Sequence, residues 1–247
     1  KNINIKPMAI CLSLLLCPLM NCIDFLGIGV LLQPIEKSFN VSLEQLHWVI
    51  SIFAIGYVSV VILASRMADH LGRRKMFVSA LFSFGFFSFL CGISPSSHFS
   101  LLLLGRFFQG MSGGAMIIVA ITIITELFEG ADRKKWVSFV LGAAGIGFAL
   151  GPVLAGFLVD YLSWRFFFLI NIPIALLSMF VYLANFPKDT GSKDVHYDIW
   201  GVLLLSIALA SFAAVISEVQ YWGFFSAKSS IYNCVWIGAL VLLYFVE

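Results

Sequence analysis

Charged residues are scarce in this sequence. Of its 247 residues only 15 are Lys or Arg and 13 are Asp or Glu, so 11% of the chain is charged and 61% is hydrophobic. Soluble domains carry about a quarter charged residues, which excludes a soluble fold. The length leaves room for about eight spans of roughly 20 residues each. We therefore expect an integral membrane protein in contact with lipid, with no nucleic-acid partner.

The sequence also lacks the residue patterns of metal sites and enzyme centres. No C-x-x-C pair occurs among its five cysteines, and its four histidines lie near the ends of apolar runs or in loops. An enzyme would need His, Asp or Glu side chains converging from neighbouring spans. We expect no metal, no other cofactor and no enzyme activity. A receptor-like bundle stays open as an alternative.

Long apolar runs are what the sequence has in abundance. A bilayer satisfies no exposed backbone group, so each run is expected to be a helix. Eight runs carry one formal charge or none: residues 8–32, 46–64, 76–93, 99–125, 136–158, 166–185, 199–217 and 231–246.

Lys and Arg are distributed unequally between the two sets of loops. Eleven fall on the side of the N-terminus and three on the other side, while Arg106 lies inside a run. Cytoplasmic loops carry the excess of Lys and Arg. The N-terminus is therefore expected to face the cytoplasm in a multi-pass protein of the cytoplasmic membrane.

Asp24 and Arg106 are single charges inside apolar runs. With the expected orientation, Asp24 lies eight residues from the outer end of its helix, which is about 12 Å along the axis. Arg106 lies seven residues from the outer end of its own helix, or about 10 Å. A charge at such depth persists only where it meets a partner or a wet cavity. We expect the two to pair, with Gln109 on the same helix face as Arg106.

Two further stretches have both a structural and a functional interpretation. Residues 65–75 form either a basic cytoplasmic loop with a glycine turn or a gate in which Asp69 binds basic side chains. The gate residues would be Asp69, Gly72, Arg73, Arg74 and Lys75.

Residues 143, 147, 151 and 155 are small and recur every four positions, which permits close helix packing. Pro152 is expected to bend that helix.

Several of these motifs resemble those of the major facilitator superfamily, and more closely its fourteen-helix drug:proton antiporter branch. Residues 65–75 are similar to the family loop G-x-L-A-D-R-x-G-R-K between helices two and three. Arg106, Gln109 and Gly110 resemble the helix-four signature R-x-x-Q-G. The helix-five antiporter motif is matched by Gly147, Gly151, Pro152 and Gly156, and the W-R-x-x-F-x-x-N-x-P entry to helix six by Trp164, Arg165, Asn171 and Pro173.

The resemblance implies an all-α membrane fold with the family's N-terminal six-helix bundle in residues 1–185. A cytoplasmic connector, residues 186–198, and two linker helices, residues 199–247, would follow. The C-terminal half of the carrier would then be missing from this chain. A twelve-helix carrier cut inside its second bundle is the alternative.

The function implied is a proton-coupled antiporter that exports lipophilic or cationic drug-like compounds. Burial favours the neutral form of Asp24 while Arg106 favours its carboxylate, so protons and substrate can compete there. Gln109, Phe25 and Phe108 are candidates for the walls of the substrate cavity. Export of one specific metabolite or siderophore, or symport of a solute with protons, is the alternative on the same fold.

Overall fold

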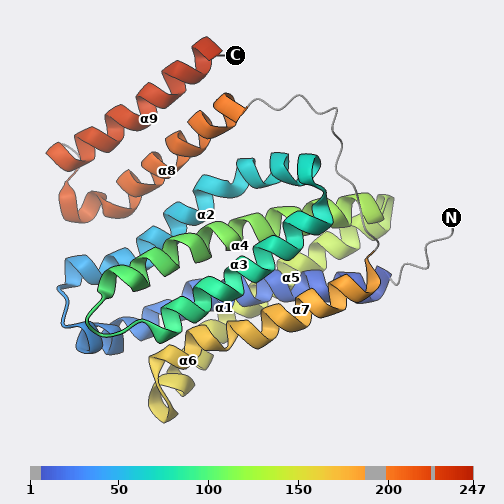
Figure 1. Cartoon of the computed structure of the whole chain (residues 1–247), viewed down its shortest axis with the longest axis horizontal. Coiled ribbons are helices and arrows are strands. Elements are labelled where there is room, and N and C mark those ends of the chain that lie inside the picture. Colours follow the sequence, from blue (N-terminus) through green and yellow to red (C-terminus); the bar gives the residue numbers. More distant parts are fainter. Residues whose placement is uncertain (1–6, 187–198, 224–225, 247) are drawn as a thin grey trace.

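The computed structural model describes residues 7–186, 199–223 and 226–246. Every regular element in these ranges is a helix, and eight spans are long and apolar enough to cross a membrane, which confirms the expected all-α membrane fold (Figure 1). The helices are α1 (Pro7–Phe39), α2 (Leu43–Leu71), α3 (Arg73–Ile93), α4 (Phe99–Leu127), α5 (Gly130–Tyr161), α6 (Trp164–Leu169), α7 (Asn171–Asn185), α8 (Ile199–Trp222) and α9 (Ala227–Val246).

Two spans differ from their expected form. The first helix continues past Leu32 to Phe39, because the polar residues that follow the apolar run still take the helical conformation. The sixth span is divided at Ile170 into α6 and α7. Pro173 has no N–H to donate to the carbonyl group of Leu169, so the helix breaks there.

The helices α1 to α7 form one bundle in which α1 packs along α5 and α4 packs against both α2 and α3. The contact between α2 and α4 is made by backbone. A Cβ atom on Gly110 would fall on the carbonyl oxygen of Phe53, and one on Gly56 would fall on that of Phe107. Glycine at these positions therefore sets how closely the two helices approach.

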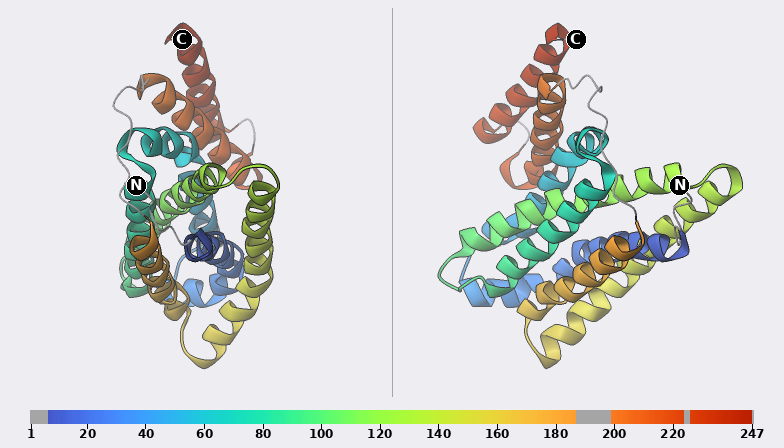
Figure 2. Two further views of the ribbon diagram at one scale, coloured as in Figure 1. Left: turned by 90° about the vertical axis from the view of Figure 1, so that its right-hand side faces the viewer. Right: turned by 45° about the vertical axis from the view of Figure 1, so that its right-hand side comes forward.

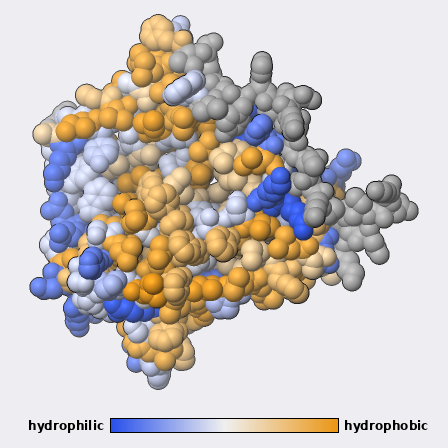
Figure 3. All heavy atoms as spheres, in the orientation of Figure 1, coloured by the Kyte–Doolittle hydropathy of each residue, from blue (hydrophilic) through white to orange (hydrophobic). Residues whose placement is uncertain are grey.

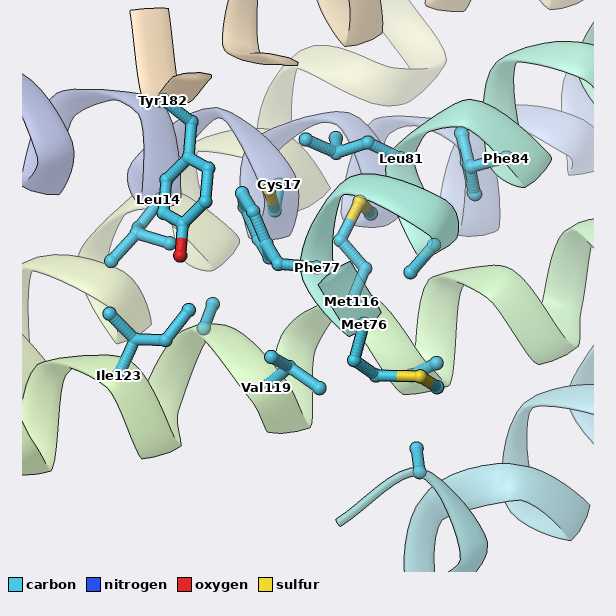
Figure 4. Packing of buried hydrophobic residues seen from close by; sticks show 14 of the residues in the cluster. Leu14, Cys17, Met76, Phe77, Leu81, Phe84, Met116, Val119, Ile123 and Tyr182 are labelled. Atoms are coloured by element: carbon cyan, nitrogen blue, oxygen red, sulfur yellow. The ribbon is translucent and has the colours of Figure 1, made fainter. Parts of the chain in front are cut away.

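Apolar side chains from α1, α2, α3, α4, α5 and α7 fill the largest cluster of the bundle, part of which is shown in Figure 4. Phe77 of α3 and Tyr182 of α7 pack with ring centroids 4.6 Å apart. Leu14 of α1 and Ile123 of α4 are fully buried in the same cluster. This cluster fixes the half of the bundle that contains the junction between α2 and α3.

The α8–α9 hairpin lies beside the bundle, with α8 against α2 (Figures 1 and 2). Hydrophobic side chains cover the middle of the face seen in Figure 3, and hydrophilic ones gather toward its ends, as expected for a chain surrounded by lipid. Residues 187–198, which make up nearly all of the expected connector, lie outside the described ranges.

We predict that Gly110→Ala lowers the free energy of unfolding by about 1–3 kcal/mol, because the added methyl group meets backbone that cannot rotate away. Gly142→Ala on α5 is the control, since no atom lies within 4 Å of its Cβ position. Unfolding of both variants in mixed micelles measures the difference. Equal stability of the two would contradict the close backbone contact.

Candidate functional site

The centre of the bundle contains a buried ion pair between Asp24 of α1 and Arg106 of α4. One carboxylate oxygen of Asp24, Oδ2, accepts a hydrogen bond from Nη1 of Arg106. Both residues have no exposed surface. The structure thus brings into contact the two charges that sequence reasoning placed at one depth.

Two amide side chains complete the coordination of the Asp24 carboxylate. Its other oxygen, Oδ1, accepts hydrogen bonds from Nε2 of Gln109 at 3.1 Å and from Nδ2 of Asn171 at 3.0 Å. The same two nitrogen atoms contact the hydroxyl oxygen of Ser88, at 2.7 and 3.3 Å. Residues from α1, α3, α4 and the start of α7 therefore meet at one carboxylate.

Several groups besides Asp24 contact the Arg106 guanidinium. Its Nε donates to the carbonyl oxygen of Val49 at 3.1 Å, and its Nη1 also donates to Oε1 of Gln109 at 2.8 Å. The guanidinium carbon lies 4.1 Å from the centroid of the Phe53 ring, a distance at which a cation is attracted to the ring face. Both Val49 and Phe53 belong to α2, so this helix also takes part in the site.

N–H donors face both carboxylate oxygens of Asp24. A carboxylate oxygen accepts at two lone-pair positions. The amide groups of Gln109 and Asn171 occupy both positions of Oδ1, whereas Arg106 occupies one position of Oδ2. Three side chains from two other helices therefore hold this carboxylate in place.

A cavity of about 310 Å³ lies next to the network, between α1, α2, α4 and α5. Phe25 and Asn21 of α1, Tyr57 of α2 and Phe148 of α5 are among its lining residues. The side-chain nitrogen of Asn21 is buried and has no hydrogen-bond partner among the described residues. Three of the eight residues that line the cavity are aromatic, and Asn21 adds an amide side chain.

The structure separates the three residues expected to line one substrate cavity. Phe25 lines the cavity just described, whereas Gln109 is fully buried in the Asp24 network. Phe108 stacks on Phe87 with ring centroids 4.9 Å apart and lines a different groove, formed by α2, α3 and α4. Phe108 points away because it follows Phe107 and precedes Gln109 on a helix, where neighbours face different directions.

Ser88, Val49 and Asn21 were not identified as site residues from the sequence. The sequence marks Asn171 only as part of the motif at the start of the sixth span. Serine and asparagine are common within membrane helices as packing residues, and a backbone carbonyl group leaves no trace in the sequence. The W-R-x-x-F-x-x-N-x-P motif, which contains Asn171 and Pro173, is the one feature of the sequence that points to one of these residues.

The junction of α2 and α3 contains a second polar cluster. Gly72 has φ 94°, a conformation that favours glycine and allows the tight turn into α3. Arg73 donates from Nη2 to Oδ1 of Asp69 at 3.2 Å and forms an ion pair with Glu126 at the end of α4. Arg74 donates to the carbonyl oxygen of Leu183 at 3.3 Å, and Lys75 is exposed. Glu126, which the sequence did not single out, links this junction to the helix that carries Arg106.

The small-residue face of α5 packs against α1. A Cβ atom on Gly147 would lie 2.5 Å from the carbonyl oxygen of Leu19, and one on Gly151 would lie 2.7 Å from that of Ile23. Ala155 on the same face is fully buried. Pro152 lies within the continuous helix α5, and Gly156 is on another face with no atom near its Cβ position. The close approach expected for this face thus involves the helix that carries Asp24.

Comparison with known proteins identifies several similar chains. The model of the Major Facilitator Superfamily matches residues 14–246. The Multidrug resistance protein Stp of Mycobacterium tuberculosis is 27% identical over 225 residues, which are 91% of this chain and 41% of Stp. The Riboflavin transporter RibZ of Clostridioides difficile is 25% identical over 76% of this chain and 41% of its own length. The chain thus spans about two fifths of these curated relatives.

A solved structure is similar in fold. The proton:xylose symporter XylE, bound to 6-bromo-6-deoxy-D-glucose, superposes with a TM-score of 0.66 over 94% of this chain and 53% of XylE. Their sequence identity is 16%. The likeness therefore concerns the arrangement of the helices.

We predict that Arg106→Ala lowers the free energy of unfolding by about 3–5 kcal/mol, because it leaves a buried carboxylate without its charged partner. The double variant Asp24→Asn with Arg106→Ala should recover part of this loss, since no unpaired charge remains. Unfolding in mixed micelles measures both variants. As a control, Lys228→Ala removes an ion pair with Glu44 that is largely exposed, and should cost less than about 1 kcal/mol. A double variant no more stable than Arg106→Ala would contradict this account.

Proposed function

The chain belongs to the Major Facilitator Superfamily, and on that basis we propose that it forms part of a proton-coupled antiporter that exports lipophilic or cationic drug-like compounds. The observation that carries the proposal is the buried pair of Asp24 and Arg106, in which the carboxylate accepts hydrogen bonds from Arg106, Gln109 and Asn171. The names of relatives such as the Multidrug resistance protein Stp support the class of substrate.

The coupling follows from the two states of the Asp24 carboxylate. In the ionised state it binds Arg106, Gln109 and Asn171, and these contacts join α1, α4 and α7. In the protonated state Asp24 carries no charge, so its ion pair with the Arg106 guanidinium is lost. Burial favours this neutral form of the acid. Proton uptake thus releases contacts between helices, and a ligand can shift the same equilibrium by preferring one state.

The energy for export would come from the proton. Moving one elementary charge across the membrane contributes about 2.3 kcal/mol for each 100 mV of membrane potential. Alternating access in secondary transporters is largely a rocking of one bundle against another around a site near the midplane. We propose that α1 to α7 are the N-terminal bundle and that a C-terminal bundle outside this chain is the other half.

The substrate would occupy the cavity lined by Phe25, Tyr57 and Phe148. Aromatic walls bind lipophilic molecules with few directional requirements, and ring faces attract cations. These properties support a broad range of drug-like substrates. The cavity lies next to the Asp24 network, so a substrate there is well placed to influence its protonation.

We propose that the junction of α2 and α3 acts as a gate at the cytoplasmic face, the side on which the excess of Lys and Arg falls. Arg73 binds both Asp69 and Glu126. Charge-assisted hydrogen bonds of this kind hold two helix ends together in one state. Their release would let the cytoplasmic side of the bundle open.

Export of one specific metabolite is the second candidate. The name of the Riboflavin transporter RibZ, which is similar over 76% of this chain, supports a single metabolite as the substrate. Counterflow measurements with dyes, with riboflavin-like metabolites and in inside-out vesicles separate the two candidates. A carrier for one metabolite would exchange that compound and leave the dyes untouched.

We predict that Asp24→Asn in the complete carrier abolishes proton-coupled efflux without preventing insertion, because the amide cannot bind and release a proton. Substrate-induced proton release from proteoliposomes is the measurement. Asp160→Asn, a change at an exposed carboxylate on α5, is the control and should transport normally. Wild-type proton release from the Asp24→Asn variant would refute the coupling role.

We also predict that Arg106→Lys retains part of the transport that Arg106→Ala loses. Lysine restores the positive charge next to Asp24 but has no second group to donate to the carbonyl oxygen of Val49. Initial rates of efflux for the two variants give the comparison. Equal rates would indicate that the geometry of the guanidinium, and not its charge, is required.

A further inference from the structure

A second buried acid lies outside the Asp24 network, on α8. Glu218 has no exposed surface and is the sole charged residue in the sequence of α8. Its Oε1 lies 3.2 Å from Nδ1 of His47 on α2, and the same nitrogen lies 3.0 Å from the hydroxyl oxygen of Ser51. The other carboxylate oxygen, Oε2, is buried with no hydrogen-bond partner among the described residues.

The position of this pair relates it to the first site. His47 and Ser51 are one turn apart on α2, on the side that faces α8. Val49 and Phe53, each two positions further along the helix, contact Arg106 instead. Residues two apart on a helix point in nearly opposite directions. The same two turns of α2 therefore hold Arg106 on one face and Glu218 on the other.

The contact between His47 and Glu218 must contain a proton. An ionised carboxylate is an acceptor only, so Nδ1 donates to it, or else the protonated acid donates to Nδ1. If a neutral His47 donated to an ionised Glu218, the pair would carry one negative charge on a carboxyl group that has no exposed surface. Such a charge is costly unless it is paired.

Among the described residues, no cation is in contact with the Glu218 carboxylate other than His47 in its protonated form. On α2, Glu44 is exposed, and it lies 3.8 Å from Lys228 at the start of α9. The Lys228 ammonium lies over the Trp222 ring, 5.8 Å from its centroid, and Tyr221 of α8 packs its ring against that of His47. Lys228 is the sole charged residue in the sequence of α9. The negative charge on the pair can therefore be cancelled by a further proton.

We propose that His47 and Glu218 form a second proton-binding site, on the face of α2 opposite Arg106. The proton comes from water and binds either to Nε2 of the His47 imidazole or to a carboxylate oxygen of Glu218. The pair is then an imidazolium with a carboxylate, or a neutral imidazole with a neutral acid, and its net charge is zero in both forms. The His47 side chain is 21% exposed, which gives the proton a path to the buried carboxyl group.

The site would hold α8 against α2 while the proton is bound. Loss of the proton would leave a buried negative charge, which is relieved when Glu218 moves toward water and α8 leaves its place on α2. The Trp48 and Trp222 rings, whose centroids are 5.7 Å apart at the same contact, would separate in that event. The site goes beyond the proposed exchange of protons and drugs, because it involves a helix outside the six-span bundle.

The test counts the proton on the pair in the complete carrier, reconstituted in nanodiscs near neutral pH. Nitrogen NMR of labelled histidine reports whether both ring nitrogens of His47 carry hydrogen, and infrared difference spectra report a protonated Glu218. We expect one of these two signals in the wild type and neither in Glu218→Gln. The control Glu44→Gln, which changes an exposed glutamate at the same contact, should keep the wild-type signal.

A neutral His47 beside an ionised Glu218 in the wild type would overturn the proposal. So would a wild-type proton count in Glu218→Gln. His47→Gln provides an independent measurement if Glu218→Gln does not fold, and it also assigns the His47 resonance. In that variant Glu218 should be the protonated acid, because its titratable partner is gone, and an ionised Glu218 there would equally contradict the proposal.

Discussion

The ion pair between Asp24 and Arg106 is the interaction on which the arrangement of the bundle depends. Two charges without any exposed surface are stable only when each is paired and hydrogen-bonded. The groups that satisfy them come from α1, α2, α3, α4 and α7. The need to satisfy one carboxylate and one guanidinium therefore fixes the relative positions of five helices.

Close backbone contacts bring these groups within reach. Glycines at positions 56 and 110 let α2 and α4 touch, so that the carbonyl group of Val49 and the ring of Phe53 reach Arg106. Glycines at positions 147 and 151 let α5 lie directly on α1, beside the turn that carries Asp24. Small residues in these helices thus serve the charged site, although they lie outside it.

Helix α2 is the element shared by everything that we propose for this chain. One face contacts the Arg106 guanidinium, the opposite face contacts Glu218 of α8, and its end carries Asp69, which binds Arg73. We propose that a movement of α2 at one of these contacts changes the other two, because all three are made by one helix. Proton binding at Asp24, proton binding at Glu218 and opening of the gate would be linked in this way.

The sequence by itself determined the membrane class, the eight spans, the place of Asp24 and Arg106 inside apolar spans, and the small-residue face of α5, because each depends on local hydrophobicity or on helical spacing. It did not determine which direction Phe108 faces, or that Asn171 and Ser88 join the Asp24 network. Most of these spans are apolar all round, so the pattern of residues does not mark the buried face. The place of α8 on α2 and the contact of Glu218 with His47 were decided by tertiary packing, which joins residues 171 positions apart.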